Sequence, residues 1–111
     1  MKSPTNLFAD IPEQSNQELC TTLVEHPHCR IERIVSYGQA SPEGFWYDQS
    51  WDEWVLLLKG SAELDLNGLI ATLTPGDHLL IPAGLRHRVC KTDSDQPTIW
   101  LAIHIDTTTK A

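Results

Sequence analysis

The segment from Gly76 to His87 restricts the fold more than any other part of the sequence. It reads GDHLLIPAGLRH, a short apolar run of β type with a turn signal at each end. Gly76-Asp77 favours a turn, because glycine accepts a positive φ and aspartate can hydrogen-bond its own backbone. Pro82 ends the run, since proline has no N–H for the ladder of a central strand. The segment therefore predicts one strand between two tight turns, which brings the imidazole of His87 to a defined place.

Short runs with the composition of β-strands recur along the chain, and turn residues separate them. The clearest pair is 62–66 and 69–73, which Asn67-Gly68 joins in the way typical of a two-residue β-hairpin. This spacing predicts an all-β sandwich or barrel, and 111 residues are enough for one domain with a single core. Further strands are expected at residues 30–37, 54–58, 78–81, 88–91 and 98–105.

The chain divides into three parts by composition. Residues 1–29 are expected to form an N-terminal arm that packs on the rest, residues 30–105 the barrel, and residues 106–111 a polar tail. Within the arm, residues 14–25 fit a short helix, and they equally fit an edge strand at 21–24. The buried side of such a helix would consist of Leu19, Leu23 and Val24.

The charge and cysteine content argue against several classes of partner and compartment. Fifteen acidic residues against eight Lys and Arg give a formal net charge of −7, so the chain lacks the basic surface that binds nucleic acid or an anionic membrane. No apolar run approaches the ~20 residues of a transmembrane helix, and the N-terminal residues lack the pattern of a secretory signal. The three cysteines have no zinc-type spacing, which favours a reducing cytoplasmic compartment.

Two patterns in this sequence are similar to the motifs of the cupin family. Within residues 76–87 the pattern G-x5-P-x-G-x2-H resembles the second cupin motif, and E-x6-G at residues 53–60 resembles the second half of the first. The chain is more narrowly similar to the short single-domain bacterial cupins of the cupin 2 type. This resemblance implies an all-β double-stranded β-helix (cupin or jelly-roll) barrel, usually dimeric, with a binding site in its mouth.

The metal site of the family is only half present. In an ordinary cupin two histidines of the first motif, its glutamate and the histidine of the second motif hold a divalent metal ion. The resemblance places Tyr47, Gln49, Glu53 and His87 at these positions. Carboxylate and imidazole are good ligands, whereas an amide oxygen is weaker and a neutral phenol is poor. We therefore expect zinc, nickel, iron or manganese to bind more weakly than in an ordinary cupin.

The last predicted strand offers a replacement ligand. Residues two apart on a strand point the same way, so Trp100, Ala102 and His104 share a face. If this face lines the barrel, Trp100 contacts the bound molecule and His104 joins Glu53 and His87 near the mouth. The alternative is that His104 is an ordinary hydrogen-bonded strand residue at the rim.

Two features predict how a ligand would be held without a metal. Glu53 and His87 would form a carboxylate–imidazole pair that could act as general acid and base, because burial and a nearby opposite charge shift both pKa values. Arg33, on the apolar face of residues 30–37, could clamp a substrate carboxylate in a fork geometry. The alternative for Arg33 is pairing with an acidic neighbour.

The strand around Glu53 also predicts a subunit interface. A strand that turns Glu53 inward turns Trp54, Leu56 and Leu58 outward. Such an apolar stripe is too large to remain exposed to water. Either the N-terminal arm or a second copy of the chain covers it, and we expect a homodimer.

Together these features predict a small cupin barrel that binds a small polar molecule in its mouth, with or without a divalent metal ion. Tyr47 and Gln49 would position the ligand beside Glu53 and His87. The alternative is a non-catalytic, metal-free binding or sensing module that keeps the pocket and has lost the metal site. The sequence leaves open whether the protein is an enzyme, since this fold hosts many chemistries.

Overall fold

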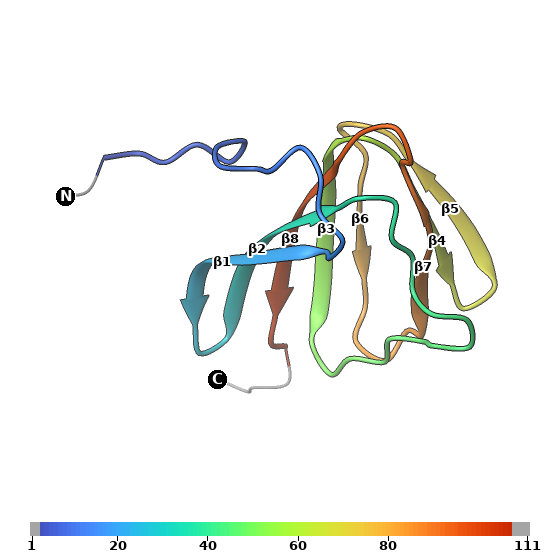
Figure 1. Cartoon of the computed structure of the whole chain (residues 1–111). Coiled ribbons are helices and arrows are strands. Elements are labelled where there is room, and N and C mark those ends of the chain that lie inside the picture. Colours follow the sequence, from blue (N-terminus) through green and yellow to red (C-terminus); the bar gives the residue numbers. More distant parts are fainter. Residues whose placement is uncertain (1–2, 108–111) are drawn as a thin grey trace.

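The computed structural model describes residues 3–107, which form eight β-strands in two antiparallel sheets (Figure 1). The strands are β1 (Leu19–His26), β2 (Cys29–Ser36), β3 (Asp52–Lys59), β4 (Ala62–Leu66), β5 (Leu69–Leu73), β6 (His78–Ile81), β7 (His87–Thr92) and β8 (Thr98–Ile105). One sheet has five strands in the order β1-β2-β8-β3-β6, and the other has three in the order β5-β4-β7. The predicted all-β jelly-roll architecture is confirmed. In this part of the chain no helix is long and apolar enough to cross a membrane.

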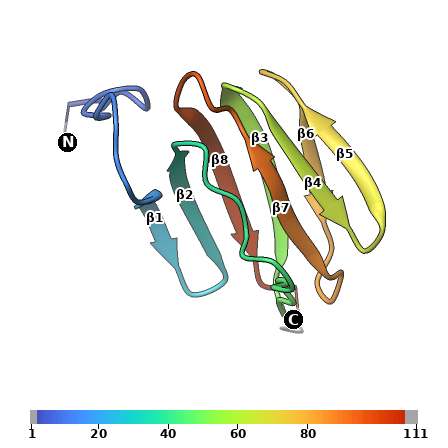
Figure 2. The ribbon, with the colours of Figure 1, turned by 45° about the vertical axis from the view of Figure 1, so that its right-hand side comes forward.

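The core lies between the two sheets, which face each other (Figure 2). β3 alternates strictly, so that Val55 and Leu57 are buried at 4% and 0% exposure while Trp54 points to the outer face. Toward the start of β3 and the end of β8 the inward positions become polar. Glu53 and His104 occupy them, and these two residues are direct cross-strand partners. The fold therefore places a carboxylate and an imidazole at one end of an otherwise apolar core.

Two turns predicted from local sequence are confirmed. Asn67 and Gly68, between β4 and β5, have positive φ values of 53° and 104°. Gly76 has a φ of 95°, and the carboxylate of Asp77 accepts a hydrogen bond from the N–H of Thr74 at 2.8 Å. This second turn carries the chain from β5 into β6, which then pairs with β3.

Residues 14–25 do not form a helix, and the edge-strand alternative is correct. β1 pairs antiparallel with β2. The free edge of β2 offers backbone groups that need partners, whereas so short a helix is marginal in water. The predicted burial of Leu23 and Val24 was wrong, because these side chains are 43% and 49% exposed on the edge strand. The sheet thus begins at Leu19 and not at residue 30.

The arm before β1 is tied to the outer face of the five-stranded sheet. Nη1 of Arg33, on β2, donates hydrogen bonds to the carbonyl oxygens of Leu7 at 3.1 Å and Ala9 at 2.8 Å. The hydroxyl of Tyr37, just beyond β2, donates to the carbonyl oxygen of Pro12 at 2.7 Å. These bonds hold the arm against one end of β2, while Val24 and Leu80, elsewhere on the outer face, are 49% and 51% exposed.

Candidate functional site

A pocket of about 280 Å³ lies between the two sheets, at the end where β3 begins and β8 finishes. This volume lies just below the usual range for ligand pockets, ~300–1,000 Å³. Its polar side chains come from β2, β3, β7 and β8, from the loop before β3, and from the edge strand β1 with the residue before it. Its apolar wall is formed by Ile34, Val55, Leu64, Ile81, Val89 and Trp100.

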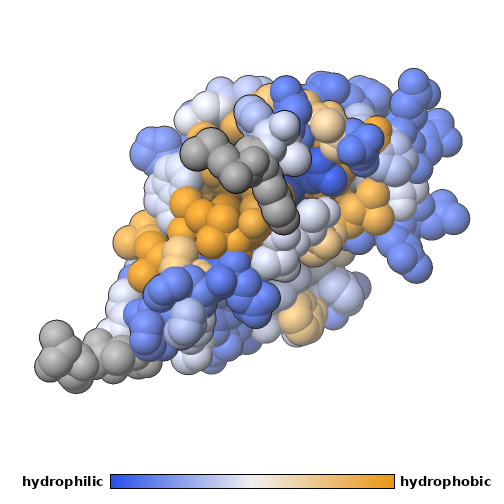
Figure 3. Space-filling view, turned by 90° about the vertical axis from the view of Figure 1, so that its left-hand side faces the viewer, coloured by the Kyte–Doolittle hydropathy of each residue, from blue (hydrophilic) through white to orange (hydrophobic). Residues whose placement is uncertain are grey.

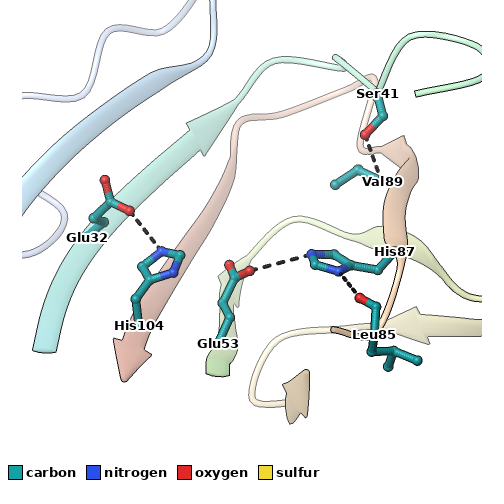
Figure 4. A network of polar contacts seen from close by, with 7 residues as sticks. All are labelled: Glu32, Ser41, Glu53, Leu85, His87, Val89 and His104. Atoms are coloured by element: carbon teal, nitrogen blue, oxygen red, sulfur yellow. Dashed lines mark hydrogen bonds and ion pairs between the residues drawn. The ribbon is translucent and has the colours of Figure 1, made fainter. Parts of the chain in front are cut away.

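Glu53 and His87 form a buried carboxylate–imidazole pair in this pocket (Figure 4). Oε1 of Glu53 lies 3.6 Å from Nε2 of His87, and the two residues are 9% and 5% exposed. The other ring nitrogen of His87, Nδ1, lies 3.0 Å from the carbonyl oxygen of Leu85. Because a carbonyl only accepts, Nδ1 carries a hydrogen, and Nε2 carries one as well only when the ring is protonated. The contact with Glu53 therefore favours the imidazolium form.

The surroundings of His87 raise its pKa above the ordinary value of 6.5. Burial by itself lowers the pKa, because it disfavours the charged ring. The side-chain contact with Glu53, the carbonyl of Leu85 and the negative charge of Glu53 act in the opposite direction and outweigh burial. His87 thus keeps its proton to a higher pH than a free histidine would.

We expect this pair to make stability depend on pH. Since the folded pKa of His87 lies above the unfolded value, its contribution to the free energy of unfolding is complete below about pH 6.5 and is lost as the pH rises through the folded pKa. Urea unfolding of wild type and His87→Asn from roughly pH 5 to 9 should show the difference between them shrinking on the alkaline side. A difference that grows with pH would contradict the pair, and NMR titration of the ring gives the pKa directly.

A second carboxylate–imidazole pair lies beside the first, and no motif pointed to it. Oε1 of Glu32 lies 3.0 Å from Nε2 of His104, which is 7% exposed (Figure 4). The same oxygen lies 3.5 Å from Nε of Arg30. The signal was in the alternation of residues 30–37, because Arg30, Glu32 and Ile34 share the face that lines the pocket. The opposite face of residues 30–37 is the more apolar one, and it carries Arg33, the residue that the sequence predicted as a ligand clamp.

Tyr47 and Gln49 both line the pocket from the loop before β3. Two backbone hydrogen bonds, of 2.7 and 3.1 Å, join Tyr47 to His87, and the two rings stack with 5.3 Å between their centroids. Burial, followed by the negative charges of Glu18 and Glu53, raises the pKa of Tyr47. Its side chain therefore stays a neutral phenol, which is a poor metal ligand.

The arrangement of the donors does not fit a metal site. Among residues 3–107 no group of three or more His, Cys, Asp or Glu side chains is placed to hold a metal ion. Nε2 of His104 faces Glu32, while Nε2 of His87 faces Glu53. The predicted ligands Gln49, Glu53, His87 and His104 all line one pocket.

Arg33 lies outside the pocket, and the prediction that it clamps a substrate carboxylate was wrong. The alternation of β2 puts Arg33 on the outer face, where its guanidinium donates to carbonyl oxygens of the arm. The guanidinium that lines the pocket belongs to Arg30. The bonds from Nη1 thus tie the Arg33 guanidinium to the arm and not to the pocket.

Two facing antiparallel sheets, with a pocket between them that polar side chains enter at one end, define this protein as a jelly-roll barrel of the cupin type. The family model described as Cupin domain matches residues 34–104, which is well over half of the chain. The chain belongs to this family.

Three similar proteins show how far the likeness extends. The crystal structure of a "putative mannose-6-phosphate isomerase" from Ralstonia eutropha JMP134 is 47% identical, covers 96% of this chain and 100% of that one, and has a TM-score of 0.92. A cupin superfamily protein from Desulfitobacterium hafniense DCB-2 has a TM-score of 0.78 over 95% of this chain and 92% of that one; at 22% identity it shows the fold alone. The 3-hydroxyanthranilate 3,4-dioxygenase of Rattus norvegicus is 34% identical over 55 residues, which is 50% of this chain. The chain spans only 18% of the length of that dioxygenase.

Proposed function

We propose that this protein binds a small polar molecule in the pocket between its sheets, without the help of a metal ion. The observation that carries the proposal is the Glu53–His87 pair in the wall of a pocket of about 280 Å³, where Oε1 of Glu53 lies 3.6 Å from Nε2 of His87. Burial of charged groups is unfavourable unless they are compensated, so a buried pair beside an open space marks a candidate binding site.

The two residues have complementary roles toward a ligand. The carboxylate of Glu53 accepts hydrogen bonds, and the protonated Nε2 of His87 donates one. A ligand hydroxyl can donate to the first and accept from the second, while the apolar wall takes the hydrocarbon part of the molecule. The same pair can transfer a proton to or from a ligand whose acidic hydrogen lies between Glu53 and His87. With such a ligand the pocket would be an active site and not only a binding site.

The pocket does not support a sugar phosphate as the ligand, although the name of the relative from Ralstonia eutropha contains one. Three carboxylates face the pocket, from Glu18, Glu32 and Glu53, against the guanidinium of Arg30 and the imidazolium of His87. Phosphate is bound where arginines and lysines supply positive charge. The match to the rat dioxygenase does not support that activity for this protein either, because it covers half of this chain and 18% of that one.

The test is a fragment screen on protein freed of metal with EDTA, observed by NMR shifts of backbone amides. We expect fragments with a hydroxyl or amine to shift pocket residues, and His87→Ala to weaken them about tenfold, as for the loss of one hydrogen bond to a charged group. His78→Ala is the matched control, because His78 is exposed and lies outside this pocket. Equal affinity in wild type and His87→Ala would exclude His87 from the site.

Calorimetric titration with zinc, nickel, iron(II) and manganese tests the metal-free part of the proposal. We expect weak binding that His87→Ala and His78→Ala change equally. Tight, stoichiometric binding that His87→Ala abolishes would overturn it in favour of a metal site at Glu53 and His87.

We also propose that a second copy of the chain covers the outer face of the five-stranded sheet. Figure 3 shows hydrophobic residues clustered on the side of the molecule that carries β1 and β2. A row of apolar side chains crosses all five strands in register, and those at its two ends, Val24 and Leu80, are 49% and 51% exposed. Monomers seldom expose a continuous patch of this kind, and two copies of one face form a symmetric dimer. The outer row consists of Val24, Ile31, Ile103, Trp54 and Leu80.

A further inference from the structure

The two carboxylate–imidazole pairs form one row across the pocket. Glu32, His104 and Glu53 lie on β2, β8 and β3, which are neighbours in the sheet, and His104 is the cross-strand partner of Glu53. His87 approaches Glu53 from β7, in the opposite sheet. Figure 4 shows the four side chains in the order Glu32, His104, Glu53 and His87. A ligand in the pocket therefore faces this row and not a single pair.

The row offers more hydrogen-bond acceptors than donors. The carboxylate of Glu32 lies 3.0 Å from Nε2 of His104 and can only accept, so Nε2 carries a hydrogen that points at Glu32. Each carboxylate has a second oxygen besides the one in contact with its histidine. The donor that the row offers to a ligand is the Nε2 hydrogen of His87, which a ligand shares with Glu53 at 3.6 Å. A ligand that satisfies this row must therefore mainly donate hydrogen bonds.

The pocket is also negatively charged. Its three carboxylates outnumber the guanidinium of Arg30 and the imidazolium of His87. Neighbouring side chains respond to this charge. Burial, followed by the charges of Glu18 and Glu32, raises the pKa of the Cys20 thiol at the pocket edge, so an added negative charge is disfavoured there.

Aromatic rings complete the surroundings of a ligand. Trp100 lies in the pocket wall at 5% exposure, and Tyr47 lies at the rim at 38% exposure. The faces of such rings attract cations, more strongly where water is excluded. Carboxylates beside aromatic rings are a combination that suits an organic ammonium group.

We propose that the pocket selects a small organic cation, with its ammonium group on Glu32, His104 and Glu53 and its apolar body against Trp100. This inference rests on the proposed function, because it names the class of molecule that the same pocket takes. Glu32, which belongs to neither cupin motif, becomes the residue that determines specificity. Carboxylates and phosphates are disfavoured, since they would add negative charge and bring no donors.

The test compares three probes of one shape, which are benzylamine, benzyl alcohol and benzoate. NMR titrations of wild-type protein in EDTA should give benzylamine an affinity at least about tenfold above that of benzyl alcohol, and benzoate the weakest. In Glu32→Gln the affinity for benzylamine should fall about tenfold, while the affinity for benzyl alcohol should stay within about twofold of wild type. Retained binding of benzyl alcohol also shows that the variant is folded. Glu63→Gln is the matched control, because Glu63 is a β4 carboxylate that does not line the pocket.

Each other outcome overturns the inference in a recognisable way. Equal affinities for the three probes would remove the preference for a cation and leave small-molecule binding intact. A benzylamine preference that persists in Glu32→Gln would exclude Glu32 as its source. If none of the three probes binds, the cation site is wrong, and the fragment screen described above decides separately whether the pocket binds small molecules at all.

Discussion

Replacing Gly60 with alanine should lower the free energy of unfolding by about 2 to 5 kcal/mol, from backbone strain together with overpacking. Gly60 has a φ of +88°, and a Cβ there would lie 2.6 Å from Oγ1 and 2.8 Å from Cα of Thr98, and 3.1 Å from the carbonyl oxygen of Pro97. These atoms cannot retreat easily, because Thr98 is fully buried at the start of β8 and its Oγ1 lies 3.2 Å from the carbonyl oxygen of Ser61. Thermal unfolding followed by circular dichroism should show a midpoint lower by roughly 10 °C or more.

The matched control is Gly76→Ala, which separates the close contact from the backbone strain. Gly76 has a nearly equal φ of +95°, and a Cβ there meets no atom within 4 Å. We therefore expect Gly76→Ala to lower the free energy of unfolding by about 1 to 2 kcal/mol, from backbone strain alone. If Gly60→Ala lowers the free energy of unfolding no more than Gly76→Ala does, the predicted close contact between a Cβ at position 60 and Thr98 is wrong.

Replacing Leu80 with arginine should convert the expected homodimer into a folded monomer. Leu80 lies at one end of the outer row and is 51% exposed in the isolated chain. An arginine there would reach water in the monomer, whereas in the dimer its charge would be buried without a partner. The loss of an apolar interface anchor and the cost of the charge should raise the dissociation constant by about 100-fold or more. Sedimentation velocity over a range of concentrations measures this change.

Ile70→Arg provides the control for the interface. Ile70 is 52% exposed, which nearly equals the value for Leu80, but it lies on β5 in the three-stranded sheet. This variant should keep the association of the wild type. A wild type that stays monomeric at every concentration would contradict the dimer, and a dimeric Leu80→Arg would move the interface to another face.

Some elements were predictable because their causes are local. Asn67-Gly68 forms the β4–β5 turn since both residues tolerate positive φ, and the Gly76-Asp77 turn follows from the same property with an aspartate cap. In both turns the deciding interactions lie within a few residues of sequence. The inward position of Glu53 was implied by the resemblance to the first cupin motif, and alternation along β3 then put Val55 and Leu57 on the same face.

Other parts of the site were not predictable for the opposite reason. The pair of Glu32 and His104 joins β2 to β8, and its contact depends on which face of β2 looks inward. Local hydrophobicity pointed to the wrong face, because the outer face of β2 is itself apolar. Arg33 was misassigned in the same way, since its partners are carbonyl oxygens of Leu7 and Ala9, far away in sequence.

The sequence by itself determined an all-β fold and most of its strands and turns, because periodicity and turn chemistry act over short distances. That Glu53 and His87 share one site was implied by the resemblance to the cupin motifs. Only the tertiary structure decided that residues 19–26 pair as an edge strand, that Arg33 holds the arm, and that Glu32 and His104 extend the site into a row of four. These outcomes depend on which sheet edge is free and which face is enclosed. Both are properties of the assembled sheets, and no stretch of the chain contains them alone.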